Sequence, residues 1–200
     1  MADPSIDAGP GVAAPGVAAY EAGDYARAHD LLKPAADAGD LQARYLMARL
    51  LSGDISTMTD YGRARSFLDK RVRCHTPDAL NLYGYLLAPN GGQASYQTYL
   101  KQARIYKEAA AAGSHKALFN LGLITIRHLK KHVIGGAYML DAAERGDIDA
   151  KSILDKVVQR DWGDKALLLA QEKAREEPFD VRWPSLANLS SQCKRFNAYR

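Results

Sequence analysis

The sequence predicts an all-α protein, a right-handed α-solenoid built from helix-turn-helix repeats. The first observation is an eleven-residue sequence motif that recurs in four similar copies. The copies begin at Lys33, Asp69, Lys107 and Leu140, which are 36, 38 and 33 residues apart. That spacing is typical of helical-hairpin solenoids. The second is the composition, 47% hydrophobic and 25% charged over 200 residues, which indicates a globular chain with a sizeable core.

Each part of this sequence motif has a role at a junction between two helices. Pairs of alanines remove side-chain bulk near a helix end, so that another helix can approach closely. A glycine then ends the helix in the left-handed conformation, and the next residue caps a new one. The glycines are Gly39, Gly113 and Gly146, and the caps are Asp40, Ser114 and Asp147. In the second copy His75 replaces the glycine, Thr76 is the cap, Pro77 is the first helical residue, and Arg71 and Val72 replace the alanine pair.

Apolar residues at helical spacing predict the helices on either side of these turns. A first hairpin is expected over residues 16–32. The helices that follow the turns are expected within 41–51, 78–87, 116–126 and 149–158, and the second helices of the pairs within 60–70, 96–110, 135–143 and 163–177. The clearest break is the loop from Ala88 to Ser95. We therefore expect a flexible lead-in at 1–15, a solenoid at 16–177 and a C-terminal cap at 178–200.

The repeats resemble the Sel1-like repeat family, a relative of the tetratricopeptide repeats. The resemblance rests on the repeat length, on the alanine pair before the glycine, and on a small residue inside the following helix, best seen at Leu121 with Gly122 and at Tyr83 with Gly84. Two copies depart from that pattern. They have Met47 with Ala48 and Leu154 with Asp155 at these positions.

The resemblance implies a protein that holds other proteins in a groove lined by the first helix of each hairpin. The groove positions lie four residues apart, on one helical face. They are Tyr45 and Arg49, Asn81 and Tyr85, Phe119 and Leu123, and Ser152 and Lys156. Tyrosine and arginine are enriched at binding hot spots, and Phe119 with Leu123 would form an exposed apolar patch. In the alternative register, shifted by one residue, Phe119 and Tyr45 lie in the core.

Catalytic and cofactor motifs are missing from the sequence, so we expect no enzyme, no cofactor and no metal. His128 and His132 share a helical face only if the helix extends that far, and no third ligand is indicated. Ser114 next to His115 is explained as a helix cap. The tripeptide from Arg145 to Asp147 resembles an adhesion motif but occupies a turn of the repeat.

The formal net charge of +4 indicates a mildly basic protein, which favours an acidic protein partner over nucleic acid. Basic residues gather at 63–75 and 127–132, either as a solvated surface or as a docking surface for an acidic partner. Cys74 and Cys193 are expected as free thiols, with a single long-loop disulfide as the alternative.

No run of 18 or more apolar residues predicts a membrane span. The first sixteen residues have neither a charged n-region nor an apolar h-region, so they are not an intact secretory signal. Many bacterial Sel1-like proteins are exported, which favours a periplasmic or envelope location, with a cytoplasmic one as the alternative.

The main hypothesis is a non-catalytic module that binds one protein partner. In its most specific form it is an immunity protein that neutralises a toxic effector of type VI secretion, as some members of the Sel1-like family do. A scaffold in an envelope or signalling assembly is the alternative. A further hypothesis is an enzyme that acts on cell-wall or lactam compounds. The pattern favours it least, because the relatives linked to that role carry a disulfide in each repeat, whereas this chain has only two cysteines.

Overall fold

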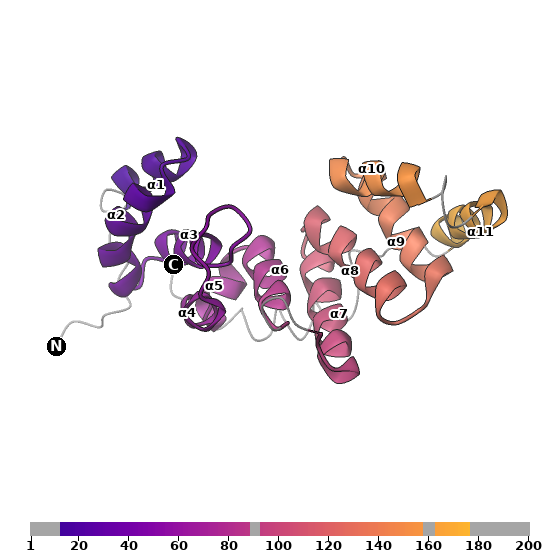
Figure 1. Cartoon of the computed structure of the whole chain (residues 1–200), viewed down its shortest axis with the longest axis horizontal. Coiled ribbons are helices and arrows are strands. Elements are labelled where there is room, and N and C mark those ends of the chain that lie inside the picture. Colours follow the sequence, from indigo (N-terminus) through magenta and orange to yellow (C-terminus); the bar gives the residue numbers. More distant parts are fainter. Residues whose placement is uncertain (1–12, 89–92, 158–162, 177–200) are drawn as a thin grey trace. The chain divides into compact units, whose positions relative to one another are not determined.

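The computed structural model describes residues 13–88, 93–157 and 163–176, and these residues form eleven α-helices and no strand. The all-α prediction is confirmed. The chain divides into two compact units whose boundary lies between Leu86 and Leu87, beside the predicted break. Figure 1 shows the helices of each unit in sequence order.

The first unit holds α1 (Ala14–Glu21), α2 (Tyr25–Asp37), α3 (Leu41–Leu50), α4 (Tyr61–Phe67), α5 (Lys70–His75) and α6 (Pro77–Tyr85). The second holds α7 (Tyr96–Ala111), α8 (His115–Arg127), α9 (His132–Glu144), α10 (Ile148–Val157) and α11 (Gly163–Glu176). Within each unit, helices that follow one another in sequence pack together, α1 on α2, α2 on α3, α7 on α8 and α8 on α9. The predicted C-terminal cap and nearly all of the lead-in lie outside the described residues.

The predicted turns are confirmed at the level of single residues. Gly39, Gly113 and Gly146 have φ angles of 96°, 108° and 93°, in the left-handed region that only glycine adopts readily. The caps also form. Their side chains accept backbone N–H groups in the first turn of the next helix, at 2.7 Å for Asp40, 3.3 Å for Ser114, 2.8 Å for Asp147 and 3.4 Å for Thr76.

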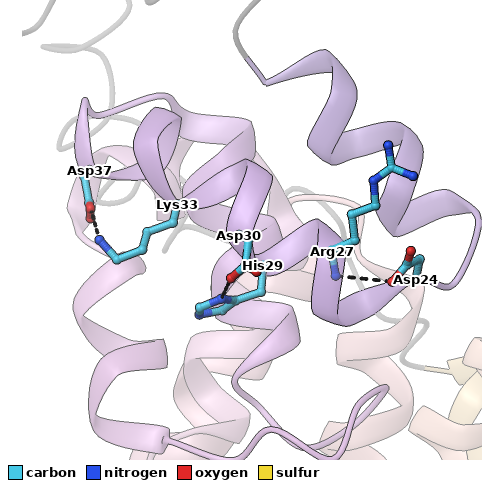
Figure 2. A network of polar contacts seen from close by, with 6 residues as sticks. All are labelled: Asp24, Arg27, His29, Asp30, Lys33 and Asp37. Atoms are coloured by element: carbon cyan, nitrogen blue, oxygen red, sulfur yellow. Dashed lines mark hydrogen bonds and ion pairs between the residues drawn. The ribbon is translucent and has the colours of Figure 1, made fainter.

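Helix α2 shows how a repeat helix separates its core face from its outer face. Leu32 and three alanines of α2 are buried against α1 and α3. The outer face carries polar pairs, which Figure 2 shows: His29 with Asp30 at 3.1 Å and Lys33 with Asp37 at 2.6 Å. Exposed pairs of this kind contribute little to stability, whereas burial of the apolar face stabilises the fold.

In the second unit, two glycines let α8 and α9 approach each other closely. A Cβ atom on Gly122 would overlap Cγ of Met139 and would lie 3.0 Å from the carbonyl oxygen of Gly135. A Cβ atom on Gly135 would lie 2.6 Å from Cγ1 of Ile126. The small residue after Leu121 therefore permits the tight packing of this hairpin.

The helix expected within residues 60–70 is interrupted. Helix α4 covers only its first part, and a separate helix, α5, follows. Helix α4 ends at Phe67, and Asp69 starts α5 by accepting the N–H of Val72 at 3.1 Å. The guanidinium of Arg73 donates to the carbonyl of Leu68 at 2.8 Å, which satisfies a backbone group freed by the break. Two short helices therefore take the place of one.

A tyrosine cluster as the candidate binding site

Five tyrosines of the first unit form the candidate site, and we call them the tyrosine cluster. They are Tyr20 near the end of α1, Tyr25 at the start of α2, Tyr45 in α3, Tyr61 at the start of α4 and Tyr85 at the end of α6. Four of the five stand at the end of a helix or one residue from it. The cluster thus draws side chains from both members of the helix pairs.

A repeated motif places two of these tyrosines. Asp24 and Asp60 cap α2 and α4 by accepting the N–H groups of Arg27 at 3.2 Å and Arg63 at 2.9 Å. The tyrosine after each aspartate is therefore the first residue of its helix. Tyr25 and Tyr61 were not predicted as site residues, although the recurrence of Asp-Tyr-x-Arg-Ala at 24–28 and 60–64 is a signal that could have found them.

Ring contacts and one hydrogen bond join four of the five tyrosines in two pairs. The rings of Tyr20 and Tyr25 meet edge to face, with centroids 5.8 Å apart. The rings of Tyr61 and Tyr85 lie 5.9 Å apart, and their hydroxyl oxygens are 3.0 Å from each other. Tyr85 is 39% exposed. Each pair is therefore held by its own contacts, while Tyr85 remains open to solvent.

Arg49, one turn after Tyr45 in α3, supplies the charge of the site. A side-chain hydrogen bond joins it to Tyr45, and its Nη2 lies 3.7 Å from the Oδ2 of Asp54. Burial alone would lower the pKa of Arg49, but the hydrogen bond with Tyr45 and the fields of Tyr20 and Asp54 raise it. The guanidinium therefore stays charged.

A hollow of about 410 Å³ adjoins the cluster, between the first turn of α2 and the loop that joins α3 to α4. Tyr25, Ile55 and Met58 supply its larger apolar side chains. Asp54 also lines it, so the residue that pairs with Arg49 is at the same time part of its wall. The loop is held by the Ser56 hydroxyl, which donates to the carbonyl of Leu50 at 2.6 Å.

The surroundings of the cluster raise the pKa of three of its tyrosine hydroxyls. Burial, as the largest cause, raises the pKa of Tyr20, Tyr45 and Tyr61, and the hydrogen bond with Tyr85 adds to the increase at Tyr61. A folded-state pKa above the unfolded value means that the group favours the folded state at low pH and loses that contribution as pH rises.

We therefore expect the contribution of these tyrosines to the free energy of unfolding to stay constant up to about pH 10 and to fall above that pH. Absorbance at 295 nm during an alkaline titration should show a group of tyrosines that ionise later in the folded protein than in urea. Urea unfolding at pH 8 and pH 10.5 checks the loss of stability. Identical titration curves in the folded and unfolded protein would contradict the buried positions of these hydroxyls.

In the first unit, two of the four predicted groove residues contact each other, and a third lies beside Tyr61. Tyr45 and Arg49 are hydrogen-bonded and half-buried, and Tyr85 is exposed beside Tyr61. The prediction that Asn81 lines an open groove is wrong. Its side chain is only 7% exposed and lies in the interior.

In the second unit, the predicted groove does not form as an exposed apolar patch. Phe119 is only 7% exposed, so the expected accessible pair of Phe119 and Leu123 is wrong. The physical reason is that α8 packs on both α7 and α9, and the largest apolar side chain of the pair is covered. Leu123 is half-buried, and Ser152 and Lys156 are exposed.

His128 and His132 do not share a helix, because the helix does not extend as far as their pairing required. Helix α8 ends at Arg127, His132 begins α9, and Lys130 between them has a φ of 56°. The His128 ring stacks on that of Tyr99, with centroids 3.8 Å apart. Among the residues that the structure describes, no group of three or more His, Cys, Asp and Glu is placed to hold a metal ion.

The tripeptide from Arg145 to Asp147 is a structural turn, as predicted. Gly146 is left-handed, Asp147 caps α10, and Nε of Arg145 donates to Asp141 at 2.8 Å. His115 also contacts the Arg145 carbonyl, with its Nδ1 at 2.8 Å. These bonds hold the tripeptide in the junction between repeats.

Cys74 is disulfide-bonded, so the expectation of free thiols is wrong for this residue. The alternative, a disulfide, is the one that the structure supports. Cys193 lies outside the described residues.

None of the helices in the described part of the chain has the length and apolar character needed to cross a membrane. Comparison of the chain with protein-family models, curated proteins and solved structures gives no match.

Proposed function

We propose that this chain is a non-catalytic module that binds one protein partner through the tyrosine cluster. The observation that supports the proposal most is that Tyr85 is exposed and paired with Tyr61, in the same unit that holds the charged Arg49 beside Tyr45. Tyrosine and arginine dominate the energetics of protein interfaces because they bury a large area and still offer hydrogen bonds. The ring contacts restrict the side chains within each of the two pairs, which reduces the entropy lost on binding.

We propose further that the helices form a right-handed solenoid of Sel1-like repeats. The left-handed glycines, the side-chain caps and the close approach at Gly122 support a repeated hairpin unit. Disulfides persist in oxidising compartments, so the bonded state of Cys74 supports a periplasmic or envelope location.

An affinity capture with matched baits tests the binding proposal. The baits are the wild-type protein, Tyr85→Ala and, as the control, Tyr96→Ala, which removes an equally large tyrosine that is 56% exposed in the second unit. We expect a partner that is retained by the wild type and the control. Tyr85→Ala should bind it about 30-fold more weakly, because a hot-spot tyrosine contributes about 2 kcal/mol. A partner held equally by all three baits would show that binding does not use the cluster.

The stoichiometry of the captured complex distinguishes the two proposed roles. One dominant partner at a one-to-one ratio, whose toxic activity is lost in the complex, supports an immunity protein. Several partners in smaller amounts support a scaffold.

A further inference from the structure

The contacts of Arg49 leave part of its hydrogen-bonding capacity unused. Its Nε is buried and has no hydrogen-bond partner, and the 3.7 Å between Nη2 and Asp54 is longer than a hydrogen bond. A guanidinium has five donors and is best satisfied by a planar carboxylate that accepts two of them. The side chain is 26% exposed, so an incoming carboxylate can reach its outer end.

The hollow beside Arg49 offers a second point of contact of a different kind. Tyr25, Ile55 and Met58 give it apolar walls, and Asp54 belongs both to these walls and to the ion pair with Arg49. Its volume of about 410 Å³ is sufficient for one large side chain. An apolar contact and a cation therefore occur side by side, with an aspartate between them.

Accepting that the cluster binds a protein, we propose that its partner presents a short segment in which a carboxylate neighbours an aliphatic or aromatic side chain. The carboxylate binds the outer end of Arg49, and the apolar side chain enters the hollow. The formal charge of +4 also favours the approach of an acidic segment. Asp54 competes with the incoming carboxylate for Arg49, so it weakens binding and selects against segments that lack a good acidic contact.

The positions of Arg49 and Asp54 give two predictions of opposite sign. Arg49→Gln should weaken binding about 10- to 100-fold, because a hydrogen-bonded charge is lost. Asp54→Asn should strengthen binding several-fold, since the competing carboxylate is removed while the backbone bond from its N–H to Ser52 Oγ remains possible. The matched control is Arg44→Gln, which makes the same change in the same helix at an arginine paired with Asp69.

The experiment uses a library of random linear peptides displayed on phage and selected on the full-length wild-type protein. We expect the selected peptides to contain Asp or Glu within two residues of Leu, Ile, Met or Phe. The best peptide is then synthesised, labelled and titrated with the wild type and the three variants, with melting curves to check that each variant is folded.

Three outcomes would overturn the inference: selected peptides without an acidic residue, equal binding to the wild type and Arg49→Gln, or no enrichment at all. Weaker binding to Asp54→Asn than to the wild type would also contradict it. None of these outcomes contradicts the proposed function, because that proposal is tested separately by the affinity capture with the wild type and Tyr85→Ala. Loss of binding in Arg44→Gln alone would place the contact elsewhere on α3.

Discussion

Replacing Phe119 by alanine is expected to lower the free energy of unfolding by about 3 to 5 kcal/mol. Phe119 is 7% exposed in α8, among buried Leu118, Leu121 and Ile124. Truncation removes the burial of the ring and leaves a cavity that the neighbouring helices fill only in part. Since natural domains are stable by about 5 to 15 kcal/mol, this is a large share of the total.

Urea unfolding followed by circular dichroism measures the effect of Phe119→Ala. The matched control is Leu123→Ala, one turn along the same helical face, where the side chain is half-buried and the loss should be smaller. A Phe119→Ala protein with unchanged stability but lost partner binding would restore the original assignment of Phe119 to an open groove.

Gly122→Ala is expected to destabilise the second unit by about 1 to 3 kcal/mol, although alanine is the better helix former. The added methyl group would overlap Met139 and approach the backbone of Gly135. A side chain can change its rotamer, but a backbone carbonyl can move only if α9 moves with it. The hairpin of α8 and α9 must therefore open slightly.

The same substitution at Gly62 provides a control of opposite sign. Gly62 lies in α4, and the nearest atom to an added Cβ is the Oδ1 of Asp60 at 3.4 Å, an ordinary contact. Gly62→Ala should therefore stabilise the protein by about 0.5 to 1 kcal/mol through helix propensity. Thermal melting of both variants makes the comparison. A stabilising effect at both sites would mean that α8 and α9 are farther apart than the structure shows.

The junctions between helices were predictable because their chemistry is local. A left-handed glycine and a capping side chain act within a few residues, so Gly113 and Ser114 specify their turn whatever packs around it. The separation of His128 from His132 was harder to predict. It depends on Lys130 adopting a left-handed φ that its residue type does not favour.

The binding site was predictable only in part, because exposure depends on how many neighbours cover each helix. The same register put Tyr45 and Arg49 on one helical face, where their side chains interact, but it also predicted an accessible Phe119, which is buried. Periodicity identifies residues that share a face of one helix. It does not tell whether a second helix already covers that face.

The break between α4 and α5 gives the tyrosine cluster two parts with different freedom to adjust. Tyr45 belongs to α3, whose buried residues include Met47 and Leu50, so moving it would disturb the core. Tyr61 begins a seven-residue helix that ends at the break, and a helix of that length is marginal by itself. The part of the cluster around Tyr61 can therefore adjust its position at a lower cost than the part formed by Tyr45 and Arg49.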